Sequence, residues 1–228
     1  MKIITIGDIH GNPNWINVVE KEQNFDKIVF AGDYVDTHLE YTSDEQKVNL
    51  QRLLKFKEDN FDKVILLYGN HDHHYNINSE HYSGFQNNMF YDFNIIYKQA
   101  IKDNLIQVIF EYDNYLFSHA GVSKTWCLNN NIKNVNEIND YLQFKPSVFN
   151  FCAGENYSDF GDDITQSPIW VRPNSLILDS VDKYVQVVGH TANENIEILE
   201  NHIFIDCFNA SKQYLVINDE DYSIEYLL

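Results

Sequence analysis

The sequence predicts an α/β fold whose C-terminal half is rich in β-strands. Three short apolar runs in the first 70 residues each stop at a glycine, and helical patterns follow the first two. From residue 106 onward, short apolar runs separated by turn residues predominate. Because 44% of the 228 residues are hydrophobic, enough apolar surface is present for one folded domain over residues 1–228.

The N-terminal half contains three strand-to-loop units in succession. The expected strands cover residues 2–6, 27–31 and 64–68, and they stop at Gly7, Gly32 and Gly69. Asn12 followed by Pro13 is expected to begin the first helix, and Ser43 with Gln46 forms a capping-box pattern for the second. Successive units of this kind favour a parallel sheet, in which ligands gather at the carboxyl ends of the strands.

The C-terminal half is expected to contain a hairpin, an insertion and further strands. Residues 106–111 and 114–118 flank an Asp113-Asn114 turn signal and predict the hairpin. Residues 124–168 lack a sustained period, which predicts an irregular insertion with some helix. The remaining apolar runs are spaced like an antiparallel meander and cover residues 184–188, 196–200, 202–206, 213–217 and 223–227.

Composition excludes some classes of partner. The 16 basic and 34 acidic residues give a net charge of −18, which disfavours binding to nucleic-acid polymers. Cys127, Cys152 and Cys207 show no CxxC spacing and are odd in number, so no disulfide framework is indicated. No apolar stretch approaches a signal peptide or membrane span. A cytoplasmic protein without a membrane partner is expected, and the oligomeric state stays open.

Polar motifs follow several of the expected strands in a fixed order. They are Gly7-Asp8-Ile9-His10-Gly11, Gly32-Asp33-Tyr34-Val35-Asp36, Gly69-Asn70-His71-Asp72, Ser118-His119-Ala120-Gly121 and Gly189-His190-Thr191. Each motif alone is a weak signal, because a lone Asp-x-His is more often a surface pair and a lone histidine is more often structural. Their joint occurrence at strand ends favours one shared site.

The residue types in these motifs suit a pair of cations. Asp8 and His10 stand two residues apart on an expected extended segment, so both side chains can bind one cation. The carboxylate of Asp33 can bridge two cations, and the second receives one amide oxygen and two imidazole nitrogens, from Asn70, His119 and His190. Two cations about 3.5–4 Å apart can hold a bridging hydroxide and stabilise an in-line displacement at phosphorus. Hydrolysis of a phosphate ester is the expected chemistry.

These motifs resemble the pattern of the calcineurin-like metallophosphoesterase superfamily: Asp-x-His, Gly-Asp, Gly-Asn-His-Asp/Glu, a later His and a final Gly-His. The stretch 32–36 resembles the phosphoprotein-phosphatase branch, particularly the serine/threonine phosphatases of bacteria and phages. The resemblance implies a four-layer sandwich of two mixed β-sheets flanked by helices. It implies two divalent ions, Mn²⁺ first and Fe or Zn as alternatives. Asp8 and His10 would hold the first ion, Asp33 would bridge, and the second would be held by Asn70, His119 and His190.

The resemblance also implies catalytic roles outside the metal ligands. His71 would protonate the leaving alcohol oxygen, and Asp36 would orient His71 and raise its pKa, with Asp72 as a secondary candidate. Arg172 resembles one of the two phosphate-binding arginines of the branch. The other position is Thr37, a departure that puts the substrate class in doubt; the neighbouring histidine, His38, is either a weak replacement or an ordinary loop residue.

The expected function is metal-dependent hydrolysis of phosphate monoesters, with phosphoserine or phosphothreonine in proteins as the first substrate class. The alternative substrate is a nucleotide or dinucleoside polyphosphate. A non-catalytic scaffold is a third possibility, although such relatives typically lose metal ligands or the catalytic histidine, and all are present here. Trp126 and Trp170 either stack on a substrate ring or, more commonly, pack in the interior. Ordinary roles are expected for the remaining histidines, His73, His74, His81 and His202.

Overall fold

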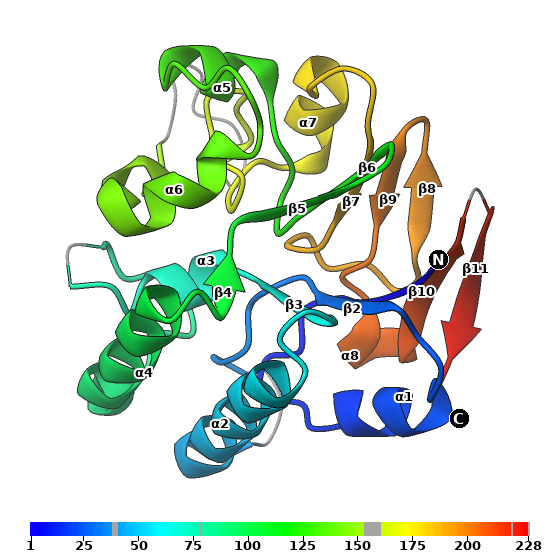
Figure 1. Ribbon diagram of the computed structural model, residues 1–228. Helices are drawn as coiled ribbons and strands as arrows, with labels where there is room; N and C mark the ends of the chain where they lie inside the picture. Colours follow the sequence, from blue (N-terminus) through cyan, green and yellow to red (C-terminus); the bar gives the residue numbers. More distant parts are fainter. Residues whose placement is uncertain (38–40, 78, 153–160, 220, 228) are drawn as a thin grey trace.

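The strands of the computed structural model form two sheets, which pack against each other through a shared apolar cluster (Figure 1). Residues 1–37, 41–77, 79–152, 161–219 and 221–227 are described. The six-stranded sheet has the order β11-β10-β1-β2-β3-β4, and the five-stranded sheet has the order β5-β6-β7-β9-β8. The strands are β1 (Lys2–Ile6), β2 (Lys27–Phe30), β3 (Val64–Leu67), β4 (Ile106–Gln107), β5 (Ile109–Tyr112), β6 (Tyr115–Ser118), β7 (Val185–Val188), β8 (Glu197–Leu199), β9 (His202–Phe204), β10 (Gln213–Asn218) and β11 (Asp221–Tyr226).

The N-terminal strands lie parallel, as the repeated strand-to-loop units predict. β1, β2, β3 and β4 are neighbours in chain order, and each pairs in parallel with the next. In the second sheet β6, β7 and β9 are parallel, while the edge strands β5 and β8 are antiparallel to their neighbours. The carboxyl ends of parallel strands from both sheets can therefore contribute loops to one region.

The expected antiparallel meander is wrong. β7 and β9 pair in parallel with β8 outside them, and the chain then crosses to the first sheet, where β10 lies antiparallel to β1 and carries β11. The spacing of apolar runs gives the length of each strand and contains no information on its partner. The hairpin of β5 and β6 around Asp113 is confirmed, with Asp113 at φ +52°.

The expected strand over residues 106–111 is divided between the sheets. β4 pairs with β3 in the first sheet, whereas β5 pairs with β6 in the second. The backbone N–H groups of Val108 and Ile109, at this crossing, both donate to Asn139 Oδ1, at 2.8 and 2.9 Å. A side chain 30 residues away therefore satisfies the amides that would otherwise continue one ladder.

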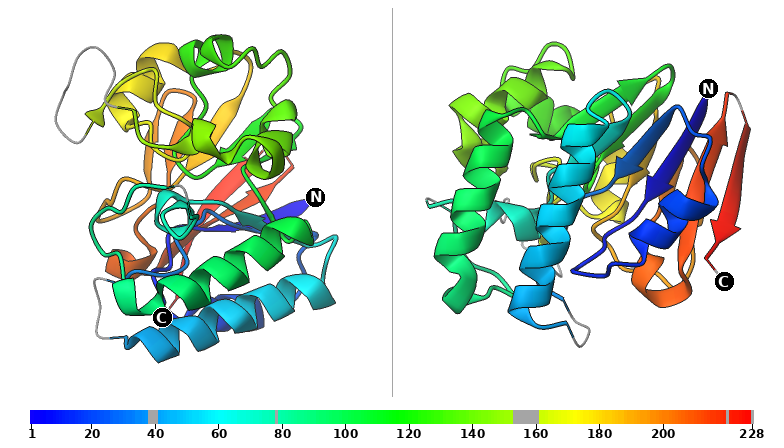
Figure 2. Two further views of the ribbon diagram at one scale, coloured as in Figure 1. Left: turned by 90° about the vertical axis from the view of Figure 1, so that its left-hand side faces the viewer. Right: turned by 60° about the horizontal axis from the view of Figure 1, so that its bottom comes forward.

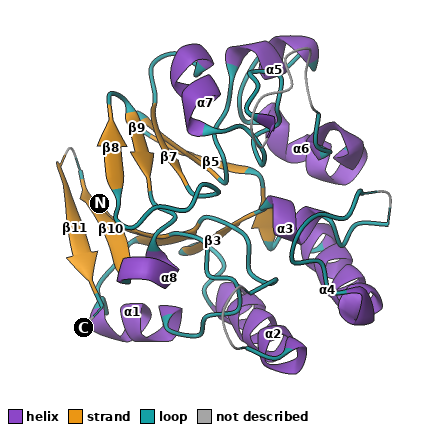
Figure 3. Ribbon diagram, turned by 180° about the vertical axis from the view of Figure 1, so that it is seen from behind, coloured by secondary structure: helices purple, strands orange, loops and turns teal. Residues whose placement is uncertain are grey.

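Helices cover the outer faces of both sheets. They are α1 (Trp15–Lys21), α2 (Ser43–Asp59), α3 (Asn70–His73), α4 (Phe90–Lys102), α5 (Lys124–Asn129), α6 (Glu137–Phe144), α7 (Pro173–Asp179) and α8 (Phe208–Ser211), with 3₁₀ turns η1 (Asn87–Met89) and η2 (Pro146–Phe149). Figures 1 and 2 show α1, α2 and α4 on the side of the first sheet, and Figure 3 shows α5, α6 and α7 on the side of the second. The expected sandwich of two mixed sheets flanked by helices is confirmed. Among the described residues, no helix combines the length and apolarity that crossing a membrane requires.

The first helix begins later than the sequence pattern predicts. α1 starts at Trp15, after Asn14, rather than at Pro13. The side chain of Asn12 accepts a hydrogen bond from the backbone N–H of Asn14 at 2.9 Å. Asn12 therefore closes the turn that precedes the helix, a common use of asparagine.

The second helix has its cap one residue earlier than expected. Thr42 is the N-cap of α2 and forms a reciprocal capping box with Glu45, which displaces the expected pair of Ser43 and Gln46. Gln46 is buried and accepts hydrogen bonds from the backbone N–H of Asp36 at 2.8 Å. The helix is therefore tied to the loop that follows β2.

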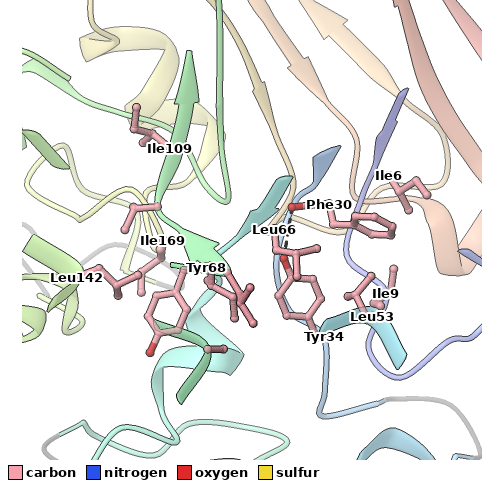
Figure 4. Close-up of a cluster of buried hydrophobic side chains, with 14 of the residues drawn as sticks. Ile6, Ile9, Phe30, Tyr34, Leu53, Leu66, Tyr68, Ile109, Leu142 and Ile169 are labelled. Atoms are coloured by element: carbon pink, nitrogen blue, oxygen red, sulfur yellow. Dashed lines mark hydrogen bonds between the residues drawn. The ribbon is translucent and has the colours of Figure 1, made fainter. Parts of the chain in front are cut away.

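Alternation along the strands separates two apolar layers. In β1, Ile3 faces the second sheet, whereas Ile4 and Ile6 face the helices, because successive side chains point to opposite sides. Figure 4 shows Ile6, Phe30 and Leu66 on the helix side; Tyr34 lies beneath them, and its hydroxyl donates to Leu67 O at 2.6 Å. Each fully buried aliphatic side chain contributes roughly 1.5–3 kcal/mol. This packing fixes the strand ends that carry the polar motifs.

Candidate metal centre

The five polar motifs meet where parallel strands of both sheets end. Asp8 follows β1, Asp33 follows β2, Asn70 begins α3 after β3, His119 follows β6 and His190 follows β7. All of these side chains are buried. The structure therefore brings together residues that are up to 182 positions apart in the chain.

Two groups of ligand atoms share one carboxylate. Asp8, His10 and Asp33 form the first group, and Asp33, His119 and His190 form the second, with the atoms of each group within 4.8 Å of one another. The Nε2 atoms of His10 and His119 lie 3.9 and 3.4 Å from Asp33 Oδ2. Atoms bound at about 2.1 Å to one cation lie about 3–3.4 Å apart. The donor set and its spacing fit two cations with Asp33 between them.

Asn70 completes the second group. Its Oδ1 lies 2.8 Å from His119 Nε2 and 2.8 Å from His190 Nδ1. Amide oxygen, carboxylate oxygen and imidazole nitrogen form the mixed donor set that Mn, Fe and Zn accept.

Each of the three clustered imidazoles is anchored through the ring nitrogen that faces away from the cluster. His10 Nδ1 lies 2.9 Å from Val35 O, His119 Nδ1 lies 2.8 Å from Ala31 O, and His190 Nε2 lies 3.2 Å from Trp170 O. A carbonyl oxygen accepts only, so the nitrogen beside it carries the proton. The lone pair of each ring is then on the nitrogen that faces the cluster, as in metal sites with ordered outer contacts.

The loops that carry the site are backbone-strained. His10, Asp33, Asp36 and His190 have φ of +43°, +52°, +63° and +68°, in the left-handed region that non-glycine residues seldom adopt. The expectation that Asp8 and His10 lie on an extended segment is therefore wrong for His10. Its N–H donates to Asp33 O at 2.9 Å, which joins the loops after β1 and β2. Strain of about 1–3 kcal/mol per residue persists only where the surrounding structure imposes the conformation, as the bonds between these loops do.

Two glycines allow the carboxylates to lie against the backbone. A Cβ atom at Gly69 would meet Asp33 Oδ1 at 2.1 Å, and one at Gly189 would meet Asp8 Oδ1 at 2.0 Å. Any side chain at these positions would displace a carboxylate of the cluster. The glycines are therefore required by the space that the ligands occupy.

The cluster has an excess of buried negative charge. Burial raises the pKa of Asp8, and the neighbouring carboxylates of Asp206 and Asp33 raise it further. Burial alone would also raise the pKa of Asp33, but electrostatic interactions with His119 and His71 hold it well below its usual range. The buried carboxylates thus need positive charge, which divalent cations supply.

His71 and Asp36 form a pair beside this cluster. His71 Nδ1 lies 3.2 Å from Asp36 Oδ2, and its ring centroid lies 5.1 Å from that of His10. Burial opposes protonation of His71, but Asp33 and then Asp36 outweigh it and raise the pKa to about 9. Asp72, the secondary candidate for orienting His71, instead accepts hydrogen bonds from Tyr97 and from the backbone of the neighbouring loops.

The carboxylate of Asp36 is held by donors that sequence reasoning missed. Besides His71, it accepts hydrogen bonds from His74 Nε2, the Tyr75 hydroxyl and Gln86 Nε2. Although burial acts in the opposite direction, the bonds from His71 and His74 lower its pKa. Asp36 is therefore held as an anion, which favours the protonated form of His71.

Arg172 is bonded to the loop that carries His190. Its Nη1 donates to His190 O at 3.2 Å and to Thr191 Oγ1 at 3.1 Å. Its Nε is buried and has no hydrogen-bond partner within the described residues. The Thr37 backbone N–H donates to Gln46 Oε1 at 3.3 Å, and His38 lies outside the described residues.

Asp206 is a further buried carboxylate of the cluster that the sequence motifs did not predict. It follows β9 as the other polar residues follow their strands, and its side chain is buried. Burial and then the Asp33 charge raise its pKa to about 6. The strand-end rule applied to β9 would have found it, but the expected strand over residues 202–206 absorbed Asp206 as a strand residue.

The remaining aromatic and histidine candidates divide into two kinds. His73 bonds Asn150 at 2.8 Å, His81 stacks on Phe85 and His202 is buried in the second sheet, so these have structural contacts. Trp126 is buried and stacks on Phe149. Trp170 differs, because its ring lies 5.8 Å from that of His190.

Solved structures share this fold at low sequence identity. A cold-active protein-tyrosine phosphatase of the psychrophile Shewanella sp. is 17% identical with a TM-score of 0.65, over 100% of this chain and 80% of that one. A serine/threonine phosphatase from Saccharomyces cerevisiae with similarity to human PP5 is 13% identical (TM-score 0.57, 100% and 80% covered). A metallophosphoesterase from Sphaerobacter thermophilus is 12% identical (TM-score 0.50, 100% and 89% covered). These likenesses show the fold.

No curated protein matches the sequence. The family model described as calcineurin-like phosphoesterase matches residues 1–213, which includes every motif of the cluster. The family implies a dinuclear centre of divalent metal ions, and the donor set of the cluster fits one. The chain therefore belongs to the calcineurin-like phosphoesterase family and is a metal-dependent phosphatase.

Proposed function

We propose that the chain hydrolyses phosphate monoesters at a dinuclear centre held by Asp8, His10, Asp33, Asn70, His119 and His190. The observation that carries this proposal is the anchoring of three imidazoles to backbone carbonyls, with the other nitrogen of each ring turned toward ligand groups that share Asp33. When bound, two divalent cations supply Lewis acidity that neutralises charge on the phosphoryl oxygens. Mn²⁺ is proposed first, with Fe and Zn as alternatives, because the donors mix nitrogen and oxygen.

The chain's own groups divide the remaining work. Arg172 binds phosphoryl oxygens, because its guanidinium has a buried N–H without a partner among the described residues. His71 donates a proton to the leaving alcohol oxygen, and Asp36 keeps His71 oriented and protonated before transfer. Water is the nucleophile, and the products are inorganic phosphate and the free alcohol.

Phosphorylated protein side chains are the proposed substrate class. The sequence contains only two arginines, Arg52 and Arg172, and Thr37 is uncharged where a second phosphate-binding arginine is expected. A monoester needs less positive charge than the chain of phosphates in a dinucleoside polyphosphate. The similar structures include protein phosphatases of both the tyrosine and the serine/threonine type. Phosphoserine and phosphothreonine remain the substrates predicted by the sequence resemblance.

The proposed setting is the cytoplasm, and residues 1–228 are proposed to act as one domain. The free thiols of Cys127, Cys152 and Cys207 support a reducing compartment. One apolar cluster contains residues of both chain halves, including Ile4 and Tyr214, which supports a single folding unit.

Metal counting combined with turnover of p-nitrophenyl phosphate tests the proposal. Asp33→Asn is expected to weaken both metal sites and to lower kcat by roughly 100-fold or more, because one carboxylate serves both groups. His190→Ala is expected to deplete mainly the second site. Elemental analysis of Mn²⁺-loaded protein measures the metals, and Asp62→Asn, an exposed position, is the control. Two metals per chain and full activity in Asp33→Asn would rule out the shared bridge.

A further inference from the structure

We infer that the enzyme prefers phosphate monoesters of aromatic alcohols, such as phosphotyrosine, because aromatic rings wall the leaving-group side of the site. The inference rests on the proposed phosphomonoesterase function and narrows its substrate class. The wall consists of Tyr82, Phe151 and Trp170, referred to below as the aromatic wall.

The loop that carries Tyr82 lies directly against the proton donor. A Cβ atom at Gly84 would lie 3.4 Å from His71 Cε1 and 3.1 Å from Asp36 Cβ, and Gly84 has φ +84°. The backbone of this loop therefore lies next to the imidazole and packs tightly on the side chain of Asp36. Since His71 protonates the leaving oxygen, the group attached to that oxygen emerges beside this loop.

The aromatic wall continues from this loop to the second ligand group. The rings of Tyr82 and Trp170 lie 4.6 Å apart in an edge-to-face arrangement, and Phe151 lies 5.2 Å from Trp170. Trp170 in turn lies 5.8 Å from the His190 ring, and its carbonyl anchors that ring. The wall thus extends from the loop whose Gly84 lies against His71 to the ring of His190.

Exposure differs along the wall in the way that a binding surface requires. Trp170 is 6% exposed, whereas Tyr82 and Phe151 are half-buried and keep part of their surface accessible to a ligand. The Tyr82 hydroxyl donates to Glu80 at 2.8 Å, which holds the ring in place. A ring fixed in this way loses little entropy when another ring packs against it.

Trp170 has a second feature that points to a ligand. Its Nε1–H is buried and lacks a hydrogen-bond partner within the described ranges, as does Nε of Arg172 two residues later. Buried N–H groups are almost always paired. These two donors belong to residues that both bond His190, which indicates that acceptors arrive with the substrate, as phosphoryl and ester oxygens do.

The chemistry agrees with an aromatic alcohol. Water attacks phosphorus, the bond from phosphorus to the phenolic oxygen breaks, and His71 returns a proton to that oxygen, giving phenol and inorganic phosphate. Contact between aromatic rings favours binding by roughly 3- to 10-fold beyond the area buried. A seryl group has no ring to place against the wall, so it gains none of this preference.

Two peptides that differ only in the phosphorylated residue, which is phosphotyrosine in one and phosphoserine in the other, test the inference in the Mn²⁺-loaded enzyme. For each variant, kcat/KM for the phosphotyrosine peptide is divided by kcat/KM for the phosphoserine peptide. This ratio is then divided by the same ratio in the wild type, and the resulting quotient no longer depends on the intrinsic reactivity of the two esters. Tyr82→Ala is expected to lower this quotient by about 3- to 10-fold, mainly through KM for phosphotyrosine. Tyr82→Phe retains the ring and is expected to keep the quotient near one.

Tyr91→Ala, an exposed tyrosine on α4, is the matched control and is expected to leave the quotient at one. An unchanged quotient in a Tyr82→Ala protein with wild-type melting temperature would overturn the inference, whether the activity on both peptides is retained or falls equally. In either case the phosphomonoesterase proposal stands, because both peptides are still hydrolysed. Hydrolysis of neither peptide nor p-nitrophenyl phosphate by the wild type would instead defeat the proposed function.

Discussion

Asp36 shows at the scale of a single residue how the candidate site is supported. Its carboxylate accepts hydrogen bonds from His71, His74, Tyr75 and Gln86, and its own N–H is bound by Gln46. Hydrogen bonds to a charged group contribute about 1.5–3 kcal/mol each, which compensates the cost of burying the anion. The orientation of His71 thus depends on residues that do not touch the substrate.

Tyr75→Phe is expected to reduce proton donation without affecting metal binding. Only the hydroxyl that donates to Asp36 is removed, so kcat should fall by about 10-fold for an alkyl phosphate, which needs a proton on its leaving oxygen. The loss should be smaller for p-nitrophenyl phosphate, whose leaving group is stable as an anion. Kinetics on both substrates and elemental analysis provide the measurements.

Tyr97→Phe is the matched control for this substitution. Tyr97 is equally buried and donates to Asp72, which holds the backbone of Asp33 and Gly69 rather than His71. Loss of the Tyr97 hydroxyl is expected to change kcat equally for the alkyl phosphate and for p-nitrophenyl phosphate. If Tyr75→Phe also affected them alike, Asp36 would not act through the proton donor.

At the scale of elements, α2 contains a buried lysine whose charge opposes folding. Lys57 is 4% exposed, and its Nζ donates to Phe61 O at 2.6 Å and Val64 O at 2.7 Å. Burial lowers its pKa from 10.5 to about 8. A neutral amine has two N–H groups, enough for both carbonyls, so the folded protein can hold Lys57 uncharged.

The stability of the wild type relative to Lys57→Met is expected to rise with pH. Between about pH 8 and 10.5 the unfolded chain keeps the proton on Lys57 while the folded chain loses it. Because the unfolded state then binds more protons, the free energy of unfolding increases with pH in this window. Urea unfolding at pH 7.5, 8.5 and 9.5 measures the difference. Lys55→Met, an exposed lysine on the same helix, should show no such rise, and a flat difference for Lys57→Met would contradict the burial argument.

The elements also show what sequence can predict. Strands β1, β2 and β3 and their order were predictable, because β-branched runs ending at glycines are local signals. The partners of β7 to β11 were not, since pairing depends on surfaces formed by the rest of the chain. The residues that meet in the cluster were predictable from the motifs. The left-handed backbone of His10 and the donors around Asp36 were not, because they arise only when distant loops meet.

At the scale of the molecule, the site joins the two sheets. Asp8, Asp33 and Asn70 come from strand ends of the first sheet, and His119 and His190 come from strand ends of the second. Gly189 N also donates to His119 O at 2.7 Å, while His190 N donates to Asp8. Cations at this position would therefore add a further link between layers that are held by apolar packing and by hydrogen bonds such as the one from His190 N to Asp8.

Removal of metal is expected to destabilise the whole molecule. A cation present at 100 times its Kd stabilises the folded state by about 2.7 kcal/mol. For a chain of this size, that corresponds to a fall in Tm of about 5–11 °C on chelation. Calorimetry with and without EDTA measures the shift, and hydrogen exchange should show loss of protection in β2 and β7 together, because both sheets contribute ligands.

Asp33→Asn is the control variant. Its fall in Tm on chelation should be smaller, since both ligand groups lose their shared oxygen. Loss of protection in one sheet alone would mean that the cations do not link the layers.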